Sequence, residues 1–234
     1  MAPTPAQARI VAALKSGPPL KMSIPICSVD NSIVGYLTPI TRQMAENPDI
    51  VDALYRWRRA RMTSFLTVFI PTPEKTRRYL TEFSLPDAAR ILFLVTDCDS
   101  RYVGHIGLCN ISPDGAEIDN VMRGEPINAP GFMVRAHAAL LGWAFSTLDI
   151  PLAYLNVLAD NSQAIRTYDK VGFHAAGTTP LTREEFDGGY RLKPAPESDT
   201  GKTGPALVRM ELRRDTFFAN DSDRAGSAAL LSCT

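Results

Sequence analysis

The segment from Tyr154 to Phe173 constrains the fold more than any other stretch of this 234-residue chain. A predicted strand ends just before Asn161, whose side chain can cap the helix that follows. Gly172 can end that helix in a left-handed conformation, and Phe173 then returns the chain to the core. Tyr168 lies seven residues after Asn161, which is about two turns along one helical face. The pattern therefore predicts a strand, a capped helix and a second strand, with Asn161 and Tyr168 on one helix face near the end of the first strand.

The remaining elements predict a mixed sheet with helices on its faces. Three apolar runs separated by turn residues are typical of consecutive antiparallel strands. A long helix with one apolar face follows them, and an alternating, half-buried strand closes the order. Two shorter helices precede the strands, so the order predicts an α/β (α+β) fold. The predicted ranges are 49–62 and 73–83 for the first helices, 91–96, 102–111 and 116–122 for the strands, 131–148 for the long helix and 207–213 for the closing strand.

Length favours a single domain, which we place at residues 32–214. Residues 1–31 are rich in Pro, Ala and Ser and show little periodicity, so a flexible N-terminal arm is predicted, with Met22 as a second candidate for the native start. Residues 179–206 are polar and contain many Gly and Pro residues, which predicts a long loop. A poorly ordered C-terminal tail is predicted for residues 215–234.

Charge and cysteine content exclude several function classes. The 25 Lys and Arg residues balance 25 Asp and Glu residues, so there is no global basic field and no nucleic-acid partner is predicted. The four cysteines are scattered and the three histidines add no metal-ligand spacing, so no metal is expected. No segment approaches the roughly 20 apolar residues of a membrane span. A reducing, cytoplasmic location without membrane association is the expectation.

The motif N-x-x-A-I-x-x-Y-x-x-x-G-F resembles the fourth-motif region of GNAT N-acetyltransferases. It is formed here by Asn161, Ala164, Ile165, Tyr168, Gly172 and Phe173. The resemblance extends over about residues 91–177 and more weakly over the first helices. It implies a GNAT fold, with a mostly antiparallel central sheet that splays into a V between its fourth and fifth strands. It also implies acetyl-CoA as the cosubstrate and direct acetyl transfer to an amine in a ternary complex.

The resemblance implies a cofactor site around the loop before the long helix. In the family this loop holds the CoA pyrophosphate through backbone N–H groups, and a helix N-terminus generally favours anions. The loop departs from the usual pattern because Asn128 replaces Arg or Gln and Met133 replaces a small residue, while Arg123 offers a replacement cation. The implied cofactor contacts are Val121, Met122, Arg123, Asn128, Ala129, Pro130, Gly131, Phe132, Met133, Asn156, Asn161, Ala164 and Tyr168.

Amide formation from a thioester and an amine needs two proton transfers, because the ammonium must lose a proton and the departing thiolate is better expelled if it gains one. By resemblance, Tyr168 is the candidate acid near the sulfur, and a carboxylate on the fourth strand is the candidate base. Glu117 and Asp119 share one face of that strand, and we favour Glu117. His105 and a water chain remain alternative bases. Backbone N–H groups where the sheet opens are expected to polarise the thioester oxygen.

The acceptor is expected beside the first helices, which border the acceptor cleft in this family. The four arginines at positions 56, 58, 59 and 61 are by default only the solvated face of a helix. Local cations could also hold a phosphorylated or nucleotide-linked acceptor, and Trp57, Arg58 and His105 are the predicted substrate contacts. Trp57-Arg58-Arg59, followed by segments 93–95 and 104–107, resembles family members that acetylate amino sugars in bacterial glycan pathways.

Three functions compete at this point. The leading prediction is acetyl transfer to a primary amine of a small molecule, with an amino sugar, free or nucleotide-linked, as the first candidate. The second is a protein N-acetyltransferase that acts on an N-terminal amine or a lysine. The third is a non-catalytic sensor of acyl-CoA, which the altered pyrophosphate loop favours and the retained Tyr168 disfavours. The protein is expected to be a monomer or a homodimer.

Overall fold

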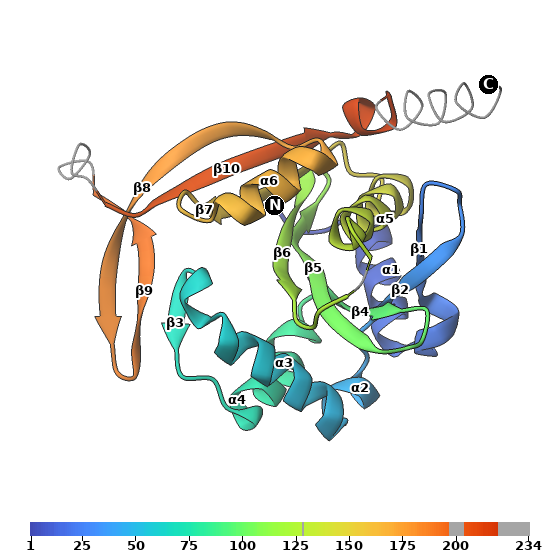
Figure 1. Cartoon of the computed structure of the whole chain (residues 1–234), viewed down its shortest axis with the longest axis horizontal. Coiled ribbons are helices and arrows are strands. Elements are labelled where there is room, and N and C mark those ends of the chain that lie inside the picture. The colour runs from blue at the N-terminus through green and yellow to red at the C-terminus, as the bar shows by residue number, and fades with distance from the viewer. Residues whose placement is uncertain (128, 197–203, 220–234) are drawn as a thin grey trace.

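The computed structural model describes residues 1–127, 129–196 and 204–219, and within them ten strands are linked in one order (Figure 1). That order is β1-β2-β4-β5-β6-β7-β10-β8-β9-β3, and every described pairing is antiparallel except that of β6 with β7. The strands are β1 Ile24–Cys27, β2 Ile33–Pro39, β3 Thr67–Phe69, β4 Ile91–Asp97, β5 Tyr102–Ser112, β6 Gly115–Arg123, β7 Leu152–Leu158, β8 His174–Phe186, β9 Gly189–Pro194 and β10 Ala206–Arg213.

Helices cover both faces of the sheet. The predicted helices at 49–62, 73–83 and 131–148, and the one predicted between Asn161 and Gly172, are confirmed as α3, α4 with the π-helical turn η3, α5 and α6. Asn47 caps α3 by accepting the Asp49 N–H at 2.9 Å, and Pro48 occupies the first turn. The helical elements are α1 Pro5–Ser16, η1 Pro19–Met22, α2 Arg42–Glu46, α3 Pro48–Ala60, η2 Met62–Ser64, α4 Pro73–Arg78, η3 Tyr79–Ser84, α5 Phe132–Thr147 and α6 Ser162–Val171.

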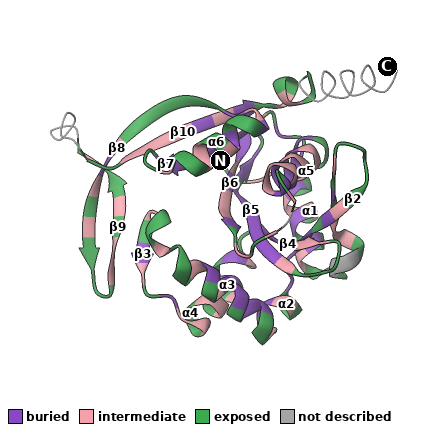
Figure 2. Cartoon of the chain, viewed as in Figure 1, coloured by how far each residue is buried: buried purple, intermediate pink, exposed green. Residues whose placement is uncertain are grey.

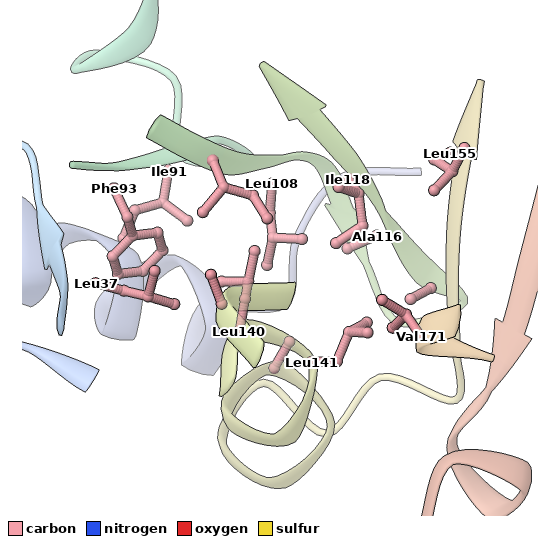
Figure 3. Close-up of a cluster of buried hydrophobic side chains, with 14 of the residues drawn as sticks. Leu37, Ile91, Phe93, Leu108, Ala116, Ile118, Leu140, Leu141, Leu155 and Val171 are labelled. Carbon is pink, nitrogen blue, oxygen red and sulfur yellow. The ribbon is translucent and has the colours of Figure 1, made fainter. Parts of the chain in front are cut away.

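Alternating side chains of β4 divide the core into two layers, because successive strand residues point to opposite faces. One set packs with α1 and α5, and the other packs with α2 and α3. The first set is Ile91, Phe93 and Val95, and the second is Leu92 and Leu94. Burial is concentrated in the central strands and on the helix faces that cover them (Figure 2). Leu140 and Leu141 of α5 lie among the strand side chains of the first layer (Figure 3).

The sheet opens between β6 and β7, which confirms the predicted V. These strands are parallel and pair only over Ala116 with Ala153 and Glu117 with Tyr154. Both strands continue past this short ladder and separate. Backbone groups on the two inner edges are therefore left without partners in the sheet, and a ligand can enter there.

The predicted flexible arm at residues 1–31 is instead a helix followed by a strand. A capping box starts α1, in which the Gln7 N–H donates to the Thr4 hydroxyl at 3.2 Å and the Thr4 N–H donates to the Gln7 side chain at 2.9 Å. The helix reaches the core through Val11, and β1 pairs with β2. Gln7 interrupts the apolar pattern, yet it is buried because its amide donates to two backbone carbonyls. The sequence therefore did not predict the helix, because a polar side chain with hydrogen-bond partners occupies a core position.

The predicted long loop at residues 179–206 is largely a β-hairpin. β8 continues to Phe186, the turn contains Gly188 with a φ of +83°, and β9 pairs with both β8 and β3. Charges link the two hairpin strands, since Lys193 donates to Glu184 at 2.7 Å. Polar, mostly exposed strands carry no apolar alternation, so pattern analysis missed them. Residues 197–203 of this segment lie outside the described residues.

The predicted tail at residues 215–234 starts within a helical segment at 214–219. Phe217 of this segment packs on Phe145 of α5, with ring centroids 5.4 Å apart. The remainder, residues 220–234, lies outside the described residues.

None of the described helices combines the length and the apolarity needed to cross a membrane.

Candidate active site

A cavity of about 670 Å³ lies at the opening between β6 and β7. Residues of β6, β7, α5 and α6 line one side, and residues of α3, β3 and α4 line the other. Such a volume is typical of sites for small molecules and cofactors. Twelve predicted residues line it, namely Arg58, His105, Glu117, Asp119, Val121, Met122, Arg123, Met133, Asn156, Asn161, Ala164 and Tyr168. Trp57, Ala129, Pro130, Gly131 and Phe132 are not part of its lining, and Asn128 lies outside the described residues.

Tyr168 is positioned by the caps of α6. The Asn161 side chain accepts the Ala164 N–H at 3.2 Å at the helix start, and Gly172 ends the helix with a φ of +116°. The Tyr168 ring packs edge-on against Phe173, with centroids 6.1 Å apart. Burial raises the pKa of Tyr168 to about 12, so the phenol stays protonated at neutral pH. Tyr168 can therefore act as a proton donor inside the cavity.

Glu117 lies where β6 and β7 part. The side-chain amides of Asn110 and Asn156 each donate to it at 2.7 Å, one to each carboxylate oxygen. Among the described residues no cation pairs with Glu117, so its partners are neutral. Its remaining lone pairs can accept a proton from an amine or a water molecule. Asn156, predicted as a cofactor contact, is thus also one of the two residues that orient Glu117.

Asp119 shares the face of Glu117 but has different partners. Arg90 Nη1 donates to its Oδ2 at 2.5 Å, and the side-chain amide of Asn120 donates to the same oxygen at 2.8 Å. Tyr79 completes the cluster, because its hydroxyl accepts from the Asn120 amide at 2.9 Å. The carboxylate is engaged by a cation, which makes Asp119 the weaker candidate base. Sequence patterns did not reveal Arg90, Tyr79 or Asn120, since only the fold brings them to Asp119.

A bulge in β6 lies beside these carboxylates. Met122 pairs with His105 and Asp119 pairs with Gly107, so three steps along β6 match two steps along β5. Asn120 in the bulge has a left-handed conformation with a φ of +51°. The ladder is interrupted at the point where β6 lines the cavity, so backbone groups there can meet a ligand.

His105 is a neutral hydrogen-bonding group. Its Nδ1 lies 2.5 Å from the Asn120 carbonyl oxygen, which requires a proton on Nδ1 and leaves Nε2 as an acceptor. Burial lowers the pKa of His105 to about 4, so the ring is uncharged at neutral pH. The neutral ring can accept a hydrogen bond through Nε2, so His105 stays an alternative to Glu117.

Trp57 supports the site from the core and does not line the cavity, which corrects its prediction as a substrate contact. It is 4% exposed, and its Nε1 donates to Glu125 at 2.8 Å. Gly124 packs so closely on the indole that a Cβ there would lie 2.1 Å from the ring. Trp57 stacks on His105, with centroids 6.1 Å apart and an interplanar angle of 27°. Its helical spacing from the apolar residues of α3 placed it in the core, while the adjacent Arg58 faces the cavity.

The loop before α5 has the features of an anion site. Gly131 has a φ of +75°, a conformation that residues with a Cβ rarely adopt. Within the described residues no side chain caps α5 and no acidic residue occupies its first turn, so the N–H groups of Met133 and Val134 are open to a ligand. Phe132 differs from its prediction, because its side chain is buried and its N–H donates to the Ala129 carbonyl at 3.1 Å. Arg135, which the sequence did not predict as a site residue, stabilises the loop by donating to the Pro130 carbonyl at 2.7 Å.

His137 of α5 is a further lining residue that sequence patterns missed. Its ring meets Tyr168 edge-on, with centroids 5.4 Å apart. Its Nδ1 lies 2.6 Å from the Met133 carbonyl, and its buried Nε2 has no hydrogen-bond partner among the described residues. Burial lowers the pKa of His137 to about 4, so the ring is neutral. Within the described residues, no group of three or more His, Cys, Asp and Glu side chains could hold a metal ion.

The splayed sheet, the open start of α5 and the capped helix that carries Tyr168 are arranged as expected for a CoA-dependent acyltransferase. The family model for the acetyltransferase (GNAT) domain matches residues 40–174, which is more than half of the chain. The chain belongs to the GNAT family of acetyltransferases. It is therefore an N-acetyltransferase that uses acetyl-CoA as its cosubstrate. No curated protein matches the sequence.

Solved structures agree with this fold. The spermidine N-acetyltransferase from Vibrio cholerae, solved with CoA and spermine, has a TM-score of 0.54 at 17% identity, over 78% of this chain and 96% of that one. A protein from Chromobacterium violaceum described as a probable GNAT-family acetyltransferase has a TM-score of 0.61 at 15% identity, over 86% of this chain and 90% of that one. At these identities the likeness shows the fold.

Proposed function

We propose that this enzyme transfers the acetyl group of acetyl-CoA to a primary amine of a small molecule, with an amino sugar, free or nucleotide-linked, as the first candidate acceptor. One observation carries the proposal. Glu117, which can accept a proton, and Tyr168, which can donate one, line a single cavity at the opening of the sheet. Amide formation needs one group of each kind.

The proposed reaction is a direct transfer in a ternary complex. Glu117, directly or through a water molecule, takes a proton from the acceptor ammonium, and the amine nitrogen attacks the thioester carbonyl. A carbon–nitrogen bond forms, and the oxyanion of the tetrahedral intermediate is stabilised by backbone N–H groups around Val121 and Met122. The carbon–sulfur bond then breaks and Tyr168 protonates the departing thiolate, while the second proton that the attacking nitrogen must lose returns through a water molecule to the Tyr168 phenolate. No cysteine nucleophile takes part.

The cofactor is proposed to enter between β6 and β7, with its pyrophosphate at the start of α5. The left-handed Gly131 and the uncapped first turn support this placement. Met133 and Ala164 line the same side of the cavity, and Arg123 supplies a cation at the end of β6. Asn161 contributes as the cap of α6 and as a lining residue.

A small-molecule acceptor is favoured over a protein acceptor by the shape of the site. Residues of α3, β3 and α4 cover the cavity opposite the cofactor side, so it has walls on two sides. The Vibrio cholerae neighbour, solved with spermine, also acts on a small amine.

The cytoplasm is proposed as the location, because the cysteines in the described part of the chain are free thiols. Residues 32–214, together with α1, are proposed as one catalytic unit.

The proposal is tested by thiol release from acetyl-CoA with a panel of acceptors. The panel contains glucosamine, a nucleotide-linked amino sugar, spermidine and a peptide with a free N-terminus. Release with an amino sugar, with the acetylated product confirmed by mass spectrometry, is the expected result. Release with the peptide alone would support a protein N-acetyltransferase instead, and binding of acetyl-CoA without turnover on any amine would support a sensor.

A further inference from the structure

The cavity carries more positive charge than the chain as a whole. The chain has 25 basic and 25 acidic residues, whereas the described residues that line the cavity include five Lys or Arg and two carboxylates. The cations are Arg58, Arg61, Lys75, Arg90 and Arg123, and the carboxylates are Glu117 and Asp119. Neighbouring like charges repel each other, so a bound anion would stabilise this arrangement.

Four of these cations have no carboxylate partner among the described residues, namely Arg123 at the end of β6 and three more on the opposite side of the cavity. Arg90 is paired with Asp119, but Arg58, Arg61 and Lys75 form no ion pair in that part of the chain. They come from α3, from the residue that follows it and from α4. These elements lie on the side of the molecule away from α5 and α6 (Figure 1). The three cations are therefore separate from the helix start proposed for the CoA pyrophosphate.

Arg58 is held in place by neutral groups only. Its Nη2 donates to the Thr67 carbonyl at 2.7 Å, and its guanidinium carbon lies 3.4 Å from the centroid of the Phe65 ring. A guanidinium has five N–H donors, so this single bond leaves others for a ligand. Burial lowers the pKa of Arg58 to about 10, which still leaves it charged at neutral pH. Among the described residues Arg58 makes no ion pair, and Asp119, the carboxylate that attracts it electrostatically, is already engaged by Arg90, so this partly buried cation gains from an anionic ligand.

Lys75 approaches the same place from α4. Its Nζ donates to the Ile70 carbonyl at 3.1 Å, which leaves two of its three N–H donors. Lys75 Nζ and the guanidinium carbon of Arg58 each lie 5.5 Å from the centroid of the Phe69 ring. The two cations thus flank one aromatic side chain at the edge of the cavity.

We propose that the acceptor carries an anionic group, a phosphate or a carboxylate, which Arg58 and Lys75 bind beside Phe69 while the amine reaches Glu117. The inference rests on the proposed acetyl transfer to a small amine and names the class of that amine. A polyamine such as the spermine in the Vibrio cholerae structure would bring further positive charge against these cations. The chain is therefore expected to discriminate against polyamines.

The test compares kcat/KM for matched amines with the full chain. Glucosamine is the reference amine without an anionic group, glucosamine 6-phosphate and glucosaminic acid add a phosphate or a carboxylate, and spermidine adds positive charge. The kcat/KM values of the anionic amines should exceed that of glucosamine by roughly tenfold to a hundredfold, as expected for charge-assisted hydrogen bonds. Comparison of the phosphate with the carboxylate amine shows which anion is preferred. Spermidine should be the poorest acceptor.

Arg58→Gln should remove most of this preference, whereas the matched control Arg59→Gln should keep it. Arg59 is the adjacent, exposed residue, lies outside the cavity lining and donates to the Tyr55 hydroxyl at 2.7 Å. Thermal melting checks that both variants fold. Equal kcat/KM for amines with and without an anionic group, or an effect of Arg58→Gln on CoA affinity alone, would overturn the inference and leave acetyl transfer intact.

Failure of the proposed function gives a different result, namely no acetylation of any amine. Calorimetry of the CoA-bound protein with the same amines then decides the inference by itself. Binding of glucosamine 6-phosphate that Arg58→Gln abolishes supports the anion site. Absence of binding overturns it.

Discussion

Replacing Tyr168 with Phe should lower kcat sharply and leave the rest of the protein unchanged. The substitution removes only the phenolic hydroxyl, which has no hydrogen-bond partner among the described residues. The ring contacts with His137 and Phe173 are retained. The free energy of unfolding should therefore change by less than about 1 kcal/mol.

The magnitude follows from the role of the hydroxyl. With a pKa of about 12, only about one phenol in ten thousand is ionised at pH 8, so nearly every molecule carries the proton that the thiolate needs. Loss of a general acid typically lowers the rate by about 10²- to 10⁴-fold, or about 3–5 kcal/mol of transition-state stabilisation. The expected result for Tyr168→Phe is a loss of this size in kcat.

The assay is steady-state thiol release, combined with calorimetry of CoA binding and thermal melting. Tyr36→Phe provides the matched control, because it makes the same chemical change at an exposed residue outside the cavity. Tyr168→Phe should bind CoA with nearly unchanged affinity, and the control should behave as wild type. A kcat for Tyr168→Phe within twofold of wild type would refute the role of the hydroxyl as proton donor.

Three further predictions concern the base, the cofactor loop and stability. Glu117→Gln should lower kcat about a hundredfold or more, whereas Asp119→Asn should cost less than tenfold; the reverse order in steady-state kinetics would assign the base to Asp119. Gly131→Ala should weaken CoA binding in calorimetry, because a φ of +75° costs a residue with a Cβ about 1–2 kcal/mol and drives the free loop into another conformation, which CoA binding must then reverse; unchanged affinity would contradict a pyrophosphate site that needs this loop conformation. His105 and His137 have folded-state pKa values of about 4, below the usual 6.5, so the unfolded chain binds more protons between these values. The contribution of these histidines to the free energy of unfolding should be complete above pH 6.5 and should decline toward pH 4 by up to about 3 kcal/mol per histidine. A free energy of unfolding that stays constant over this pH range in denaturation experiments would contradict the burial argument.

The central part of the fold was predictable because local rules and tertiary packing agree there. Asn161 and Gly172 mark the ends of α6 in the sequence, and both act as caps in the structure. The apolar runs of the central strands are buried in the core. Where local pattern and tertiary context disagree, prediction failed. Gln7 is polar yet buried, and the β8–β9 hairpin is extended yet polar and mostly exposed.

In the candidate site, too, some residues could be predicted from the sequence and others could not. Tyr168 and Glu117 could be located from the motif and from strand alternation, and both line the cavity. Arg90 could not, because its partner is 29 positions away in sequence and only the fold brings them together. His137 lies within an apolar helix, and its free Nε2 is a property of packing.

The central claim is that acetyl-CoA binds in the opening between β6 and β7 and donates its acetyl group there to a small amine. Titration of the full chain with acetyl-CoA and with free CoA by calorimetry, followed by addition of amine, tests it most directly. The account predicts saturable binding of both ligands at one site, with thiol release only after the amine is added. Absence of saturable binding would contradict it.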